Sequence, residues 1–286
     1  MNSDDITVVV TTAPRVECYL KETLYSIKEA GWQPVVFAEP GSTKTEFQTI
    51  TWDKKQGLWH NWQLAAKWAM NTESEYIMTI QDDCYMHPDT KNLLDQIPDL
   101  PSMGYLSLYT PSHYQDDQDG NPIKGLYTVS VTSVWGALAL IFHKDTLRQL
   151  LDDVRAKEWI GIKPKNAPID WRQQQQANPD RIKNSDYIIG SILHYSMSKH
   201  LYYLSPSPCR HIARYSSVGH SGNSGKRNTK YFAEESKPLF PQIFENELSI
   251  SKIGDLRISN THSRDSVYYH PESMQGLLRE RKTQKT

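Results

Sequence analysis

The ten residues YIMTIQDDCY at positions 76–85 combine an apolar run with an abrupt pair of acids. The run from Tyr76 to Ile80 is short and bounded by polar residues, which predicts a buried β-strand. Asp82 and Asp83 follow at its carboxyl end, where carboxylates are costly to bury unless a cation or a polar ligand meets them. The competing interpretation is a solvated turn after the strand, since Asp is common in turns.

The segments on the N-terminal side predict a strand, a helix and a second strand. Residues 6–12 are almost entirely β-branched, as expected of a central strand that is covered on both faces. Residues 16–30 have helical spacing, and residues 34–38 form the next apolar run. A β-α-β order implies a right-handed crossover and a parallel sheet, whose ligand crevice lies outside the carboxyl ends of the strands. The chain contains neither G-x-G-x-x-G nor the P-loop pattern, so it shows no dinucleotide or P-loop signature.

The rest of the chain predicts further strands and helices of the same kind of fold. Expected strands are 50–52, 104–109, 126–132, 135–142 and 201–204, and expected helices include those that follow Gly57, Lys144 and Ser185. Residues 113–125 are polar and rich in turn residues, which predicts a mobile loop. We therefore expect an α/β fold with a mostly parallel sheet and flanking helices over residues 1–220. Residues 221–286 are expected to form a basic loop and a polar C-terminal extension.

Composition bounds the number of domains, the kinds of partner and the expected location of the chain. The 286 residues suit one large domain or one domain with an appendage. With 32 basic and 33 acidic residues, the net charge of −1 gives no global field that favours nucleic acid or membranes. The three cysteines have no paired spacing, and no apolar run approaches the ~20 residues that span a bilayer. Because the N-terminus lacks a signal-peptide pattern, a cytoplasmic location is expected; the sequence does not indicate an oligomeric state.

Four stretches, in this order, resemble a GT-A nucleotide-sugar glycosyltransferase. They are VVVTT followed by Pro14 and Arg15, TIQDD at 79–83, WGALALIF at 135–142, and the block from SDYIIG at 185–190 to YYLSPSPCRHIARYSS at 202–217. The last block is similar to that of N-acetylglucosaminyltransferase-IV-like enzymes and their microbial and phage relatives. The resemblance covers roughly residues 6–220. Gln81 departs from it where the metal motif has an acid, and Ala213 departs where the pattern has Gly.

The resemblance implies a metal site and a catalytic base. Asp83 and His211 would bind Mn²⁺ or Mg²⁺, while Asp82 would hold the ribose or share the ion. Neutral imidazole suits Mn²⁺ better than Mg²⁺. Asp186 matches the position of the base that takes the acceptor proton, although a plain helix N-cap would also explain it. Asp170 is the second candidate for the base.

The donor-binding residues implied by the resemblance lie around the same strand ends. Arg15 could pair bidentately with phosphate, or could be a solvated cation at a helix start. Glu39 would face the base of the nucleotide, or belong to a surface turn. The full set is Thr11, Thr12, Arg15, Glu39, Asn61, Asp82, Trp135, Gly136, Arg214, Ser216 and Ser217.

The expected function is therefore metal-dependent transfer of a hexosyl or N-acetylhexosaminyl group from a UDP-sugar to an acceptor hydroxyl, with inversion. The acceptor could be a glycan, a small molecule or a hydroxymethylated base in DNA, the last being suggested by basic residues at 226, 227, 230 and 279–285. A nucleotidyltransferase is a second interpretation, although it would normally carry a Gly-rich loop and a Lys after the first strand. A non-catalytic carbohydrate- or nucleic-acid-binding protein is a third.

Overall fold

The computed structural model describes residues 1–117, 119–131, 136–157, 185–213, 229–244, 248, 253–259 and 266–270. The first half contains β1 (Ile6–Thr12), α1 (Leu20–Glu29), β2 (Val35–Ala38), β3 (Thr49–Thr51), α2 (Leu58–Ala69), β4 (Tyr76–Gln81), β5 (Cys84–Met86) and α3 (Thr90–Gln96). The second half contains β6 (Met103–Ser107), β7 (Gly125–Val131), β8 (Ala139–His143), α4 (Lys144–Asp152), α5 (Val154–Lys157), α7 (Ser185–Ser191), β9 (His200–Ser205), β10 (Cys209–His211), α8 (Leu239–Ile243), β11 (Gly254–Ser259) and β12 (Ser266–His270). Short helical turns occur at Ser3–Asp5, Ser112–Tyr114 and Ile192–Ser196.

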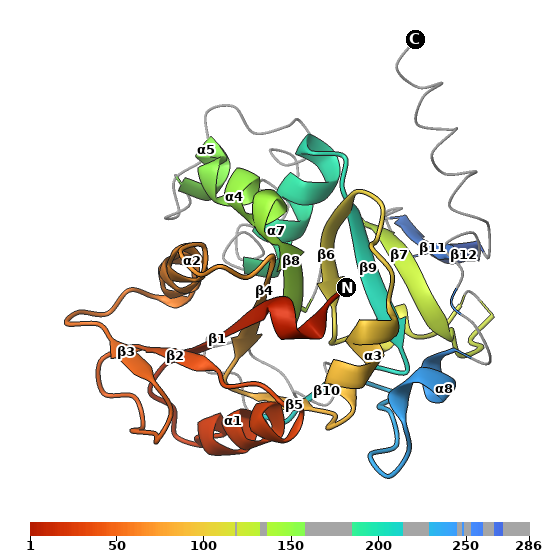
Figure 1. The fold of residues 1–286 in the computed structure, drawn as a ribbon. Helices are drawn as coiled ribbons and strands as arrows, with labels where there is room; N and C mark the ends of the chain where they lie inside the picture. Colours follow the sequence, from red (N-terminus) through yellow and green to blue (C-terminus); the bar gives the residue numbers. More distant parts are fainter. Residues whose placement is uncertain are drawn as a thin grey trace.

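One large sheet organises the molecule, in the strand order β12-β11-β7-β9-β6-β8-β4-β1-β2-β3. The first part is parallel: β1 lies between β2 and β4, and β3 is added beyond β2. β8 is antiparallel to both β4 and β6, while β9 is parallel to β6. Helices lie on both faces of this sheet (Figure 1). The predicted α/β class, with a mostly parallel sheet and flanking helices, is confirmed.

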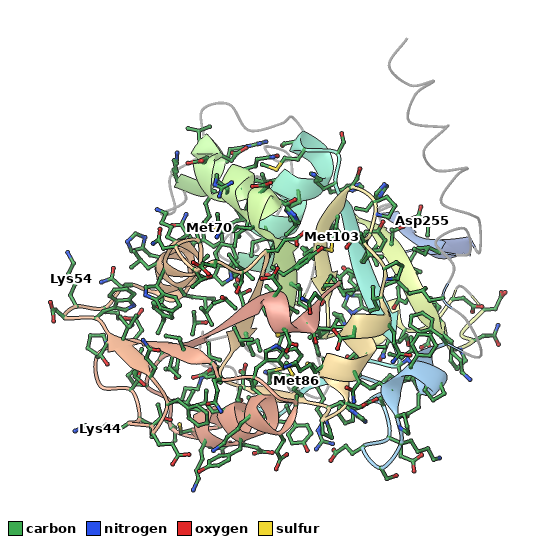
Figure 2. The ribbon with its side chains drawn as sticks, viewed as in Figure 1. Lys44, Lys54, Met70, Met86, Met103 and Asp255 are labelled. Carbon is green, nitrogen blue, oxygen red and sulfur yellow. The ribbon has the colours of Figure 1, made fainter. Side chains whose placement is uncertain are left out.

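Two hydrophobic cores form because central strands present apolar residues to both faces. In β1, Val8 and Val10 belong to the core shared with α1, α3 and α8, whereas Val9 belongs to the core shared with α2, α4 and α7. Figure 2 shows Met86 and Met103 within the body of the molecule. None of the helices in the described part of the chain is both long and apolar enough to cross a membrane.

Two local predictions are wrong for reasons of packing. The first helix begins at Leu20 rather than at residue 16, and Val16 is fully exposed in the loop that precedes it. Residues 113–125 are not simply a mobile loop, because Tyr114 and Gln115 are completely buried. The Gln115 side-chain oxygen accepts the backbone N–H groups of Lys230 and Tyr231, so this stretch is held by a distant segment.

Part of the C-terminal extension is built onto the sheet. β11 pairs in parallel with β7, and β12 pairs with β11 to form the edge (Figure 1). Leu239 and Ile243 of α8 are buried in the core that contains α1 and α3. Leu256 of β11 belongs to the other core, so residues beyond position 220 contribute to the main sheet and to both of its cores.

Candidate functional site

The acid pair lies at the carboxyl end of β4, beside the end of β1. The register places Thr11 opposite Gln81, so both strands end at the same level. Thr12 consequently reaches Asp82, and its hydroxyl donates to Asp82 Oδ2 at 2.5 Å. Asp82 and Asp83 are buried, with 1% and 5% of their surface exposed. The carboxylates therefore occupy the end of the parallel sheet where α/β folds bind ligands.

Neighbouring elements fix the backbone that carries the two acids. The Thr23 hydroxyl of α1 donates to the Asp82 carbonyl at 2.9 Å. The Gln81 side-chain amide donates to the Ala137 carbonyl at 3.0 Å, just before β8. An ionised acid at position 81 could not donate to that carbonyl. This contact explains why a neutral amide stands at this position.

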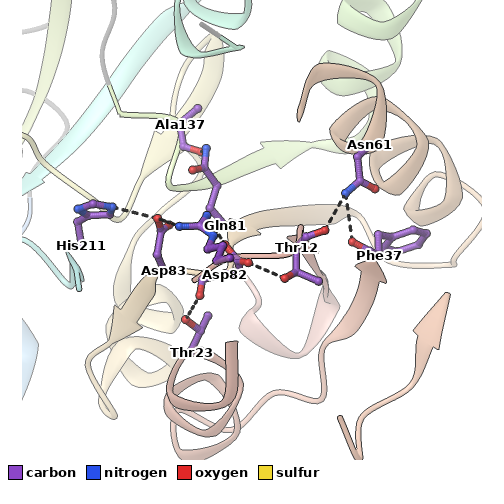
Figure 3. A network of polar contacts seen from close by, with 10 residues as sticks. Thr12, Thr23, Phe37, Asn61, Gln81, Asp82, Asp83, Ala137 and His211 are labelled. Carbon is purple, nitrogen blue, oxygen red and sulfur yellow. Dashed lines mark hydrogen bonds and ion pairs between the residues drawn. The ribbon is translucent and has the colours of Figure 1, made fainter. Parts of the chain in front are cut away.

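His211 reaches the acid pair through a second, two-stranded sheet. β10 pairs with β5 and places His211 opposite Cys84. The Ile212 N–H donates to the Asp83 carbonyl at 2.9 Å, and His211 Nε2 lies 3.1 Å from Asp83 Oδ2 (Figure 3). The contact between His211 and Asp83 joins residues that are 128 positions apart in the sequence.

Arg15 lies directly on the carboxylate pair. Its Nη1 is 2.6 Å from Asp83 Oδ2, and its Nη2 forms an ion pair with Asp82 Oδ1. The side chain is largely buried, with 12% of its surface exposed. Arg15 was expected to pair with a phosphate or to be a solvated cation; it is not solvated but paired with two acids of its own chain, and its contact with a phosphate stays a prediction.

Burial and charge give the two acids opposite pKa shifts. Burial raises the pKa of Asp82 to about 6; Arg15 counters that shift, and the nearby Asp83 charge adds to it. For Asp83, burial also opposes ionisation, but the hydrogen bond and charge of His211, together with Arg15, hold its pKa below the usual value. The pKa of Arg15 is raised because its two acidic partners outweigh the effect of burial. Asp83 is thus ionised at neutral pH and suited to bind a cation.

Replacing Asp82 with Asn is expected to stabilise the protein increasingly as the pH rises from about 4 to 7. The folded-state pKa of about 6 exceeds the usual 3.8, so the folded protein holds this proton more tightly than the unfolded chain. Wild-type stability therefore falls as the pH rises through this window, and Asn cannot ionise. The expected gain above pH 7 is about 2–3 kcal/mol, measured by urea unfolding at several pH values.

The control for this measurement is Asp145→Asn, because the Asp145 side chain is 64% exposed. It should show no comparable pH-dependent difference. A gain for Asp82→Asn that shrinks as the pH rises would contradict the assignment.

Glu39 and Asn61 make structural contacts that their predicted nucleotide role did not anticipate. The Glu39 carboxylate accepts the backbone N–H groups of Gln56 and Gly57 at 2.8 and 2.6 Å, which fixes the approach to α2. The Asn61 amide donates to the carbonyls of Phe37 and Thr12, so it ties the ends of β2 and β1 together (Figure 3). Both side chains are buried. They support the strand ends, and Thr11, also buried, lies at the end of β1.

Asp186 contacts the Gly136–Ala137 segment, which also contacts Gln81. Asp186 Oδ2 accepts the Gly136 N–H at 2.9 Å, and the next residue, Ala137, accepts from Gln81. Gly136 has φ +95°, and a Cβ there would lie 3.0 Å from the Tyr109 ring, so this close turn requires glycine. A short chain of contacts thus links Asp186 to the residues beside Asp82.

Five of the predicted site residues lie outside the described part of the chain. They are Trp135, Asp170, Arg214, Ser216 and Ser217. Among those described, Thr12, Arg15, Asp82, Asp83 and His211 come together in one cluster. The site residues that the sequence did not indicate are Thr23 and the backbone of Ala137, and only a knowledge of strand order could have identified them.

The cluster can supply part of a cation site rather than a complete cage. Within the described residues, no group of three His, Cys, Asp or Glu side chains is arranged to hold a metal ion. Asp83 Oδ1 and His211 Nδ1 are buried and have no hydrogen-bond partner among the residues that the structure describes, so the cluster offers unused ligand atoms there. Ions such as Mg²⁺ are often held by one or two carboxylates, with substrate phosphates and water completing the shell. The donor set therefore fits an ion that arrives with a phosphate ligand.

Comparisons with known proteins give partial structural likenesses. No protein-family model and no curated protein matches the sequence. Similar solved structures include S. aureus TarS residues 1–349 in complex with UDP (16% identity, TM-score 0.36, covering 50% of this chain and 48% of that one). A glycosyltransferase involved in glycosylating the major capsid of PBCV-1 shows 15% identity and TM-score 0.35, covering 67% and 76%. HddC from Yersinia pseudotuberculosis shows 10% identity and TM-score 0.31, covering 50% and 79%.

This chain spans about half the length of the TarS structure that it matches. None of the three is described as an N-acetylglucosaminyltransferase-IV-like enzyme. At these TM-scores the likenesses do not carry the functional argument, which depends on the residues of the site.

Proposed function

We propose that the chain is a divalent-cation-dependent glycosyltransferase that moves a hexosyl or N-acetylhexosaminyl group from a UDP-sugar to an acceptor hydroxyl, with inversion. The observation that carries this proposal is the buried Asp82–Asp83 pair at the carboxyl end of β4, with His211 held 3.1 Å from Asp83. Burying a carboxylate whose oxygen atoms are not all paired lowers the stability of the folded protein. Binding a cation would offset that cost.

The charge of the cluster supports the need for a divalent ion. Asp82 and Asp83 contribute two negative charges and Arg15 one permanent positive charge, so these three side chains sum to about −1 at neutral pH. A diphosphate would be repelled by that charge. A divalent cation reverses its sign, which makes the same site attractive to a nucleoside diphosphate.

Asp83 and His211 are the residues that would hold Mn²⁺, and an imidazole ligand favours Mn²⁺ over Mg²⁺. When bound, the ion supplies neutralisation of the negative charge that develops on the leaving diphosphate. Thr11 and Thr12 end β1 next to this position, so the nucleotide would lie across the ends of β1 and β4.

Asp186 is proposed to take the proton from the acceptor. The acceptor oxygen bonds to the anomeric carbon as the bond from that carbon to the phosphate oxygen breaks. UDP leaves with that electron pair, and the acceptor proton moves to the Asp186 carboxylate. The Gly136 N–H donates to Asp186 Oδ2 at 2.9 Å, which fixes the orientation of this carboxylate.

Replacing Asp186 with Asn is expected to lower the rate of transfer by about 10²–10⁴-fold. The Asn side-chain oxygen can still accept the Gly136 N–H, so the fold and UDP binding should be retained. Kinetics with donor and acceptor, together with calorimetric UDP binding, separate the two effects. Unchanged transfer would rule out Asp186 as the base.

The proposed function is tested by donor hydrolysis across a set of UDP-hexoses and UDP-N-acetylhexosamines with Mn²⁺. We expect one class to release UDP, and EDTA to stop the release. Failure of every UDP-sugar in Mn²⁺ would contradict the proposal.

The acceptor is proposed only as a hydroxyl compound. Lys230, the described member of the basic cluster, pairs with Asp116 at 2.8 Å, so its charge is already matched.

A further inference from the structure

Arg15 and a metal ion would compete for the same carboxylate, that of Asp83. Asp83 Oδ2 is 2.6 Å from Arg15 Nη1 and 3.1 Å from His211 Nε2. An ion held by both Asp83 and His211 would need to lie within about 2.0–2.2 Å of its oxygen and nitrogen ligands. Arg15 Nη1 already lies 2.6 Å from Asp83 Oδ2, and an ion at either oxygen of this carboxylate would lie close to the guanidinium charge, so the two cations would repel each other.

The contacts of Arg15 are concentrated on the acid pair. Its hydrogen bond and ion pairs are made with Asp82 and Asp83, while its buried Nε has no hydrogen-bond partner in the described part of the chain. Arg15 lies in the loop between β1 and α1, and its neighbour Val16 is fully exposed. Movement of the side chain would therefore break its links to the carboxylates while leaving the strand and helix in place.

We propose that Arg15 is the resident counter-ion of the acid pair, that a divalent ion displaces it, and that it then binds the diphosphate of the donor. This inference rests on the proposed function. It gives one residue two successive partners, first the carboxylates and then the phosphates. A guanidinium suits both, since it binds carboxylate and phosphate oxygens through the same planar set of donors.

The exchange couples the ion to the nucleotide. Without a nucleotide, an entering ion forces Arg15 away from its carboxylates and gives it no new anion. With a diphosphate present, Arg15 regains an anionic partner, so ion and nucleotide should each strengthen the binding of the other. This coupling is reciprocal by thermodynamic necessity.

The test measures Mn²⁺ binding to the complete chain by the electron paramagnetic resonance signal of free Mn²⁺, with and without UDP. Wild type should bind Mn²⁺ weakly alone and about 10-fold or more tightly with UDP, within the usual range of coupling between sites. Arg15→Gln should bind Mn²⁺ alone about 10-fold more tightly than wild type, and UDP should add little. Arg148→Gln is the matched control, because Arg148 forms an exposed ion pair with Asp145.

Arg15→Lys provides the second variant if the Gln protein does not fold. Lysine keeps the charge but lacks the planar set of donors that bridges both acids, so Mn²⁺ alone should bind more tightly than in wild type. Mn²⁺ affinity that is unchanged or weaker in the folded Arg15 variants, with wild-type coupling to UDP, would overturn the exchange and leave the proposed function standing. No Mn²⁺ binding by any variant, with or without UDP, would overturn both.

Discussion

Asp83→Asn is expected to lose Mn²⁺-dependent UDP binding and to lower donor hydrolysis by at least about 100-fold, the scale on which one charge-stabilising group acts in an active site. Asp83 is the acid whose pKa is held low and whose oxygen faces His211. An amide has the same shape but no charge for a cation. The measurements are UDP calorimetry with Mn²⁺ and UDP release from the best donor.

Asp145→Asn is the control for this change, because it removes an exposed carboxylate from the surface of α4. It should bind and hydrolyse the donor as wild type does. Retention of Mn²⁺-dependent UDP binding by a folded Asp83→Asn protein would show that the ion is not held at Asp83.

Arg15→Gln is expected to destabilise the ion-free protein by about 3–5 kcal/mol at pH 7.5, the cost of breaking a buried ion pair by removing one partner. Asp82 and Asp83 are both buried, so the loss of the guanidinium leaves two adjacent acids without their cation. Urea unfolding in EDTA measures the change in the free energy of unfolding.

The loss should be smaller at pH 5. Asp82 has a pKa of about 6 even with Arg15 present, so it is largely protonated there and the acids no longer repel. Arg148→Gln should change stability by less than about 1 kcal/mol, since exposed ion pairs contribute little. If Arg15→Gln at pH 7.5 also changed the free energy of unfolding by less than about 1 kcal/mol, the guanidinium would not be stabilising the buried Asp82–Asp83 pair.

Local sequence patterns predicted the frame of the site. The β-branched run of β1 and the apolar run before Asp82 are strong signals of buried strands, and their parallel pairing follows from the β-α-β order. The start of the first helix was less predictable. Its helical spacing extends back to residue 16, yet Val16 is left in solvent and the helix begins only at Leu20.

Long-range contacts could not be predicted from residue patterns alone. His211 was a candidate only through family resemblance, and the β5–β10 pairing that brings it to Asp83 has no local signal. The partner of Arg15 was equally hidden, because a guanidinium binds phosphate and carboxylate by the same geometry. Gln115 looked like part of a polar loop, but it is buried against the backbone of residues 230 and 231.

We propose that the Asp83–His211 cluster binds a divalent ion together with a nucleoside diphosphate. The most direct test is calorimetric titration of UDP into the wild-type protein, once with Mn²⁺ and once with EDTA. We expect binding with Mn²⁺ that weakens at least about 10-fold in EDTA, as expected for two coupled ligands. Equal UDP affinity under both conditions, or no binding in Mn²⁺, would contradict it.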